Sequence, residues 1–264
     1  KSITGFSLVE LSIVLVILGL LVGGILSGQA LIRAAELRSV VTEHQKYFTA
    51  VQTYRDKYFA LPGDNTNATM LWGKDNAACA AHTGTAATAG TCNGDGDGRI
   101  EPAAAASSTG EIQQFWKQLA LAGLIEGTFP GISDSGSAGH CNVGSACPRA
   151  RIANAGWAVE WRGNYAGDSY AYTADYGNYL VMGTQNAVYL PNNSVLRPTE
   201  AWNIDKKVDD GKPGTGTMIA LEGAAWGGAA TSKCTTSTSQ SDYAGEYNLS
   251  GSGVICALMF LRQF

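Results

Sequence analysis

The sequence lacks most of the signatures that mark enzymes. No Gly-rich phosphate loop follows a predicted strand, and neither HExxH nor GxSxG occurs. Only three histidines are present, and none lies near a nucleophile with an orienting acid. The sequence therefore predicts neither an enzyme nor an organic cofactor.

An excess of basic residues is also missing, since 22 acidic and 18 basic residues give a net charge of −4 at pH 7. A nucleic-acid groove needs a concentrated basic face, so no nucleic-acid partner is predicted. The 264 residues allow one sizeable domain plus an anchor, which is simpler than two small domains. The 33 glycines are typical of a loop-rich exported domain.

The cysteines lack a CxxC spacing, and with so few histidines beside them this argues against a metal-binding role. They form an even set of six that lies wholly after the long apolar run, as expected for a head that folds in an oxidising compartment. Fifteen pairings are possible in principle. Short spacings that close Gly/Ser/Thr-rich loops favour Cys79–Cys92, Cys141–Cys147 and Cys234–Cys256.

Charge is almost absent from residues 6–26, FSLVELSIVLVILGLLVGGIL, where Glu10 is the single ionisable side chain. The run is long enough to cross a membrane. A lone carboxylate in such a segment is costly and indicates a function. Residues 1–5, KSITG, are too short for an ordinary secretory signal ahead of it.

The stretch Gly5-Phe6-Ser-Leu-Val-Glu10 resembles the processing site of type IV pilins and type II secretion pseudopilins. The resemblance implies that residues 1–5 are a leader, that a prepilin peptidase cuts between Gly5 and Phe6, and that the new amine of Phe6 is methylated. It also implies that Glu10 directs assembly. In a filament its carboxylate would pair with the amine of Phe6 on a neighbouring copy, which makes the buried charge tolerable. A plain membrane anchor is the alternative.

A stripe of apolar and aromatic residues continues beyond this run at spacings of three and four. We expect one helix over residues 6–60, about 80 Å long, with residues 6–26 in the membrane or filament core and residues 27–60 amphipathic. Pro62 and Gly63 end it. We expect this stripe to pack on the protein's own head, with His44 a packed or interface residue: Leu37, Val40, His44, Tyr47, Val51, Tyr54 and Tyr58.

The remaining chain, residues 61–264, reads as a globular head of an α+β protein, the pilin fold. Helices are predicted over 111–125, opened by a capping box at Ser108, and over 199–207, capped by Thr199. Runs rich in Tyr, Trp and Val predict an antiparallel sheet that lies on the helix stripe. Its aromatics are also compatible with a sugar-binding surface. The predicted strands are 156–162, 170–175, 178–182, 188–190, 217–221 and 254–261.

One stretch has the spacing of a calcium loop. Asn93, Asp95 and Asp97 place oxygens at alternate positions with glycines between them, as in an EF-hand loop. The twelfth position of that loop holds Ala104 instead of a glutamate, and Glu101 at the ninth is the substitute ligand. A solvated acidic turn is the alternative.

A second acidic stretch follows the predicted helix over 199–207. Asp205, Asp209 and Asp210 converge on a glycine turn, where they repel one another unless a cation or lysines neutralise them. The stretch resembles the calcium loop of major pseudopilins. Local salt bridging is the alternative, through Lys206, Lys207 and Lys212.

These features together predict a bacterial structural subunit of a type IV pilus-like extracellular filament, with an inner-membrane pool before assembly. Its expected partners are its own copies in a helical homopolymer, the lipid bilayer, the prepilin peptidase and the inner-membrane assembly machinery. One alternative is a periplasmic type II secretion pseudopilin. Another is a membrane-anchored calcium- or carbohydrate-binding module that does not polymerise.

Overall fold

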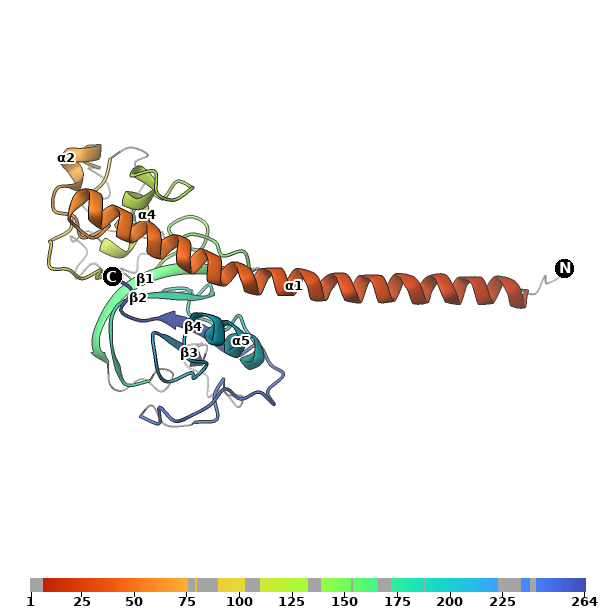
Figure 1. Ribbon diagram of the computed structural model, residues 1–264. Helices are drawn as coiled ribbons and strands as arrows, with labels where there is room; N and C mark the ends of the chain where they lie inside the picture. Colours follow the sequence, from red (N-terminus) through yellow and green to blue (C-terminus); the bar gives the residue numbers. More distant parts are fainter. Residues whose placement is uncertain are drawn as a thin grey trace.

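The computed structural model describes residues 7–75, 79, 90–102, 110–132, 139–152, 154–165, 172–187, 189–222, 234–237 and 241–264. A long N-terminal helix joins an α+β head built around an antiparallel sheet (Figure 1). The elements are α1 (Leu8–Tyr58), α2 (Ala68–Trp72), α4 (Glu111–Leu121), β1 (Ala155–Tyr165), β2 (Ala174–Thr184), α5 (Pro198–Val208), β3 (Met218–Glu222) and β4 (Cys256–Phe260).

Helix α1 is one uninterrupted element of 51 residues. At 1.5 Å per residue it is about 77 Å long, and its N-terminal half projects from the head (Figure 1). No proline occurs within it. Its last residue is Tyr58, with Phe59 as the C-cap, so it ends shortly before Pro62 as predicted.

The C-terminal half of α1 packs on the sheet and on α4 through the predicted stripe. The Tyr47 ring lies 5.7 Å from Trp157 of β1 and 5.1 Å from Trp116 of α4. His44 stacks on Phe260 of β4 at 4.2 Å, so it is a packed residue as predicted. The stripe residues Val40, Tyr47, Val51 and Tyr54 are buried.

The sheet is antiparallel with the strand order β1-β2-β4-β3. The strand predicted at 178–182 is confirmed as part of β2, which runs without a break from Ala174 to Thr184. The separate strand predicted at 170–175 is wrong in its described part, because β2 begins only at Ala174 and continues into the next predicted strand. Gly177 lies inside β2 with a positive φ and keeps its pairing with Arg162 of β1. The predicted strand at 188–190 is also wrong for its described part, since Leu190 opens a turn in which its carbonyl accepts the Asn192 N–H.

All three predicted disulfides are present: Cys79–Cys92, Cys141–Cys147 and Cys234–Cys256. The last joins residue 234 to β4, at the centre of the sheet. Each bond joins two cysteines that are at most 22 residues apart, so the pairing predicted from short loops is confirmed.

Helix α4 begins at Glu111, as predicted, but it ends at Leu121 rather than at residue 125. The N-cap of α4 is Gly110, and Ser108 lies outside the described residues. The N-cap of α5 is Arg197 rather than Thr199. Proline suits the first helical position, since its missing N–H would be unpaired there anyway, so Pro198 begins α5 one residue before Thr199.

Candidate functional site

The N-terminal half of α1 is an apolar surface without cover from its own chain. Every large apolar side chain between Leu8 and Leu26 is at least 49% exposed. By length and composition α1 could cross a membrane, and its most apolar stretch is not buried in the protein. Contiguous apolar surfaces of this kind mark contacts with lipid or protein. The segment therefore needs a covering partner.

Glu10 lies in the first turn of α1, at the tip of that surface. Its Oε2 accepts the Ser7 N–H at 2.9 Å, while Ser7 Oγ accepts the Val9 N–H at 3.3 Å, which completes a capping box. A negative charge at a helix N-terminus is also favoured by the helix dipole. The sequence reasoning missed this capping role, which the Ser7-x-x-Glu10 spacing could have indicated. Gly5 and Phe6 lie outside the described residues.

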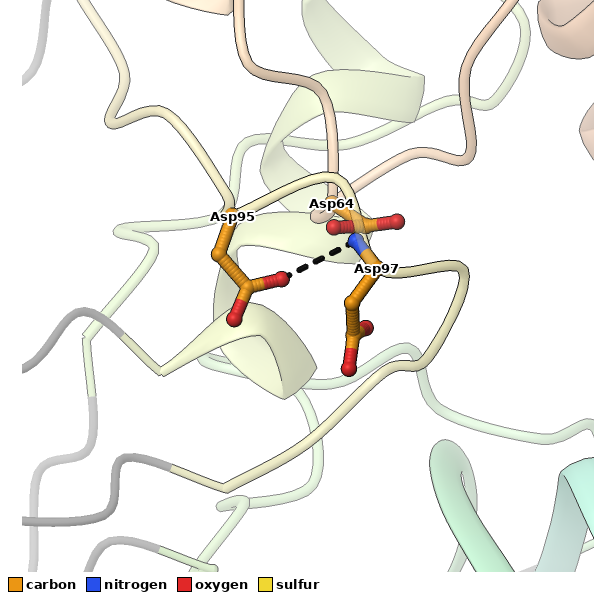
Figure 2. A group of neighbouring side chains, drawn as sticks. All are labelled: Asp64, Asp95 and Asp97. Atoms are coloured by element: carbon orange, nitrogen blue, oxygen red, sulfur yellow. Dashed lines mark hydrogen bonds between the residues drawn. The ribbon is translucent and has the colours of Figure 1, made fainter.

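The first acidic loop forms a cluster that includes an unpredicted member. Carboxylate oxygens of Asp64, Asp95 and Asp97 lie within 4.8 Å of one another (Figure 2). Asp64 follows the turn after α1, and its two oxygens accept the N–H groups of Gly96 and Gly98 at 2.5 and 2.8 Å. The predicted loop is therefore wrapped around a carboxylate from a different segment.

Two of the ligands predicted for this loop have other contacts. Asn93 Oδ1 accepts the Thr69 N–H at 2.8 Å. Glu101 lies 3.8 Å from the Arg99 guanidinium, which is also 3.6 Å from Asp97. Glu101 does not belong to the group of carboxylates that the structure brings together, whereas Asp95 and Asp97 do.

Buried acidic groups surround this loop. Glu111, the first residue of α4, accepts the N–H groups of Asp95 and Glu101, each at 3.1 Å, and burial raises its pKa to about 8. Burial also raises the pKa of Asp64, and the charges of Asp95 and Asp97 add to that effect. Three carboxylates with this mutual repulsion match the oxygen donors that a hard cation such as Ca²⁺ prefers.

The second acidic stretch forms the cluster that the sequence predicts. Carboxylate oxygens of Asp205, Asp209 and Asp210 lie within 4.8 Å of one another at the end of α5. Asp205 is buried, and it accepts the Tyr247 hydroxyl at 2.7 Å and the Gly211 N–H at 3.1 Å. Burial raises the pKa of Asp205 to about 7.

The other two carboxylates of this cluster hold the loop that leads into β3. Asp209 Oδ2 accepts the N–H groups of Thr217 and Met218, the latter at 2.9 Å. In the described residues no lysine forms an ion pair with these carboxylates, and Lys206 lies over the Trp202 ring at 4.6 Å. Carboxylate oxygens this close together are the kind of donors that Ca²⁺ prefers.

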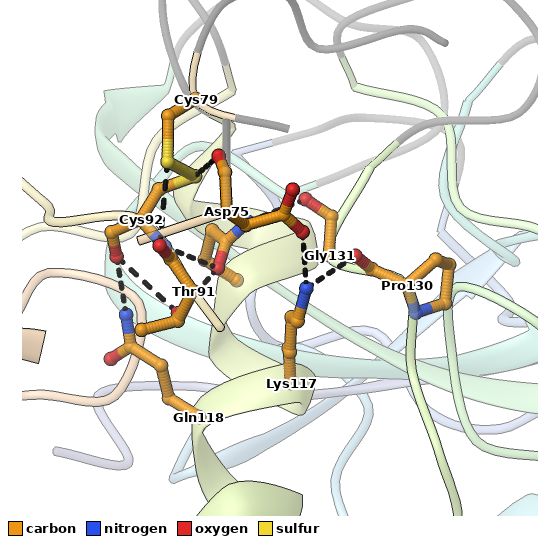
Figure 3. A network of polar contacts seen from close by, with 9 residues as sticks. Asp75, Cys79, Thr91, Cys92, Lys117, Gln118, Pro130 and Gly131 are labelled. Atoms are coloured by element: carbon orange, nitrogen blue, oxygen red, sulfur yellow. Dashed lines mark hydrogen bonds and ion pairs between the residues drawn. A yellow bond between two sulfur atoms is a disulfide. The ribbon is translucent and has the colours of Figure 1, made fainter. Parts of the chain in front are cut away.

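A buried polar network joins α4 to the disulfide-closed loop that precedes the first cluster (Figure 3). Lys117 of α4 donates to Asp75 Oδ2 at 2.7 Å and to the Pro130 carbonyl at 3.0 Å. Gln118 donates to the Cys92 carbonyl at 2.9 Å. Helix α4 therefore holds both the disulfide-closed loop and the start of the acidic loop that follows Cys92.

Comparison with protein-family models, with curated proteins and with solved structures found no match. The fold defines a class by its own features: α+β, disulfide-bonded, with a long apolar N-terminal helix and an antiparallel sheet. That arrangement is compatible with a pilin-like fold.

Proposed function

We propose that this chain is a bacterial structural subunit of a type IV pilus-like extracellular filament, held in the inner membrane before assembly. The observation that carries the proposal is the uncovered apolar half of α1, which is continuous with a half that is firmly packed in the head. Because the two halves form one continuous helix, burial of the apolar half also positions the head.

Two environments suit this segment. Covering one large apolar side chain gains about 1.5–3 kcal/mol, and the segment offers many of them. Lipid provides that cover for an isolated subunit. The same segments of other copies would provide it in a filament, with the separately folded heads outside.

Glu10 distinguishes a filament subunit from a simple membrane anchor. Replacing Glu10 with Gln keeps a capping-box residue but removes the charge that would pair with the amine of a neighbouring Phe6. We expect Glu10→Gln to abolish or disorder filaments in electron micrographs of sheared cell-surface material. Glu246→Gln, at an exposed position of the head, is the matched control and should leave filaments unchanged.

Undiminished filaments in the Glu10→Gln variant would contradict this role of Glu10. The same micrographs separate the proposed pilus from both alternatives. Neither a periplasmic secretion pseudopilin nor a membrane-anchored calcium- or carbohydrate-binding module would give a surface fibre.

The two carboxylate clusters support a calcium-binding head within this proposal. Asp205, Asp209 and Asp210 converge without a neutralising lysine among the described residues. A cation there would hold the end of α5 to the loop before β3. Calcium in this role stiffens the subunit rather than taking part in a reaction.

A further inference from the structure

Phe59 has an unusual position for a large apolar residue. It ends α1 in the left-handed region with φ 54°, where glycine is the common choice. Its side chain is 92% exposed. A bulky residue is uncommon in this conformation, and Phe59 gains no compensating burial within its own chain. The residue therefore suggests a contact outside the chain.

Phe59 borders an acidic groove at the end of the head farthest from the N-terminus, here called the distal groove. The groove has a volume of about 870 Å³. Asp56, Asp64 and Asp95 line it, and Arg55 is its single basic residue. Asp56 is exposed one helical turn before Phe59, so the two lie on neighbouring parts of the helix surface.

A second groove, here called the proximal groove, lies where α1 leaves the head, beside the start of α5. It has a volume of about 370 Å³. Its apolar walls come from Ile152, Val195 and Val254, of which Val254 is 51% exposed. Arg33 and Arg197 bring two positive charges to it, and Glu200 brings one negative charge.

The two arginines differ in their availability. Arg33 is engaged by Glu200 at 2.7 Å and by Glu36 at 3.0 Å. Arg197 is exposed, and within the described residues no ion pair involves it or Asp56. The proximal groove thus offers apolar walls and the exposed guanidinium of Arg197, whose charge also acts on Glu200, while the distal end offers an aromatic ring and the exposed carboxylate of Asp56.

These features are complementary. An arginine beside an aromatic ring gives a cation–π contact, and an arginine opposite a carboxylate gives an ion pair. Arg33 and Phe59 are 26 residues apart on one straight helix, about 40 Å, so the two grooves cannot meet within a chain. They can meet only between copies.

We propose that the distal end of one copy, with Phe59 and Asp56, docks into the proximal groove of the next copy. The partner is therefore a second copy of this chain, and the inference rests on the proposed filament. A contact between two different surfaces generates an open helical polymer when its rotation does not close into a ring. The contacting copies would be offset by about 40 Å along the helix axis.

Charge reversal tests the contact. We expect Asp56→Arg and Arg197→Asp each to reduce the recovered filament several-fold, because like charges then face one another. The double variant Asp56→Arg/Arg197→Asp should recover most of the loss. Glu246→Arg, an exposed reversal outside both grooves, is the control. Wild-type yields from both single variants, or no recovery in the double variant, would overturn the contact.

Cross-linking tests the same contact without relying on charge. In assembled material, a Phe59→Cys/Val254→Cys double variant treated with a short thiol cross-linker should give a ladder of covalent multimers. Each single variant should give no product larger than a dimer. Filaments without a ladder would overturn the contact and leave the proposed function standing. A wild-type chain that forms no filaments would instead overturn the proposed function.

Discussion

At the scale of single residues, His44 is an acid-sensitive position in the packing between α1 and β4. Its Nε2 lies 2.6 Å from Gln263 Oε1, and burial lowers its pKa below the ordinary value of 6.5. Above pH 6.5 the imidazole is neutral whether the chain is folded or unfolded. Below it, the unfolded chain binds a proton that the folded chain does not, so the free energy of unfolding falls.

His44→Gln removes this titration. We expect the wild type to lose its advantage in melting temperature over His44→Gln as the pH falls from 7.5 to 5.5. Thermal unfolding followed by circular dichroism at several pH values checks this. A difference between the two proteins that stays constant with pH would show that His44 does not titrate differently in the folded state.

Residues in the acidic clusters show what a sequence can and cannot predict. Asp205, Asp209 and Asp210 are close in sequence on a helix end, and they were predicted together. Asp64 was missed because it reaches the other cluster through tertiary packing. The one sequence feature that accompanies this packing is Gly94. A Cβ at that position would lie 2.3 Å from the Asp64 Cα, so only glycine allows the two segments to come this close.

At the scale of elements, α4 is buried on both faces. Its apolar face follows the predicted period, with Phe115 and Trp116 in the core. The opposite face, with Gln113, Lys117 and Gln118, is also buried. Its partners include backbone carbonyls of loops, which have no sequence pattern. Periodicity therefore predicts the helix but not what its polar face holds.

The buried pair of Lys117 and Asp75 gives a prediction for this element. Lys117→Ala leaves the Asp75 carboxylate without its ammonium partner, and breaking a buried pair in this way costs about 3–5 kcal/mol. Replacing both residues, in Lys117→Met/Asp75→Leu, should recover most of that loss. Denaturant unfolding measures both variants.

Lys46→Ala is the matched control, since exposed Lys46 lies on α1 and surface substitutions usually change stability by about 0.5 kcal/mol or less. If Lys117→Ala were as mild as Lys46→Ala, the pair would not be a structural support of the head.

At the scale of the whole molecule, one ion-pair cluster fixes the projecting helix to the head. Arg33 contacts Glu200 of α5 through two N–H···O bonds of 2.7 Å and the Val195 carbonyl at 3.3 Å. These bonds lie where α1 leaves the head. They add a polar contact to the aromatic packing of α1 on the head, and the period of α1 could not predict it because Glu200 is 167 residues away.

The two carboxylate clusters would affect the stability of the head as a whole. One joins the turn after α1 to the loop at Asp95 and Asp97, and the other joins the end of α5 to its following loop. A cation that binds only the folded chain stabilises it by about 2.7 kcal/mol at a concentration one hundred times its Kd. That corresponds to a rise in melting temperature of roughly 5–10 °C for a chain of this size.

Melting in excess calcium and in a chelator measures this rise. Asp97→Asn and Asp209→Asn each keep one side-chain oxygen but remove a charge, so each should reduce the calcium-dependent rise, and the double variant should nearly abolish it. A rise that survives in the double variant would place calcium elsewhere. Equal melting of the wild type with calcium and with chelator would exclude both clusters as stabilising calcium sites, because a ligand bound only by the folded chain must raise its stability.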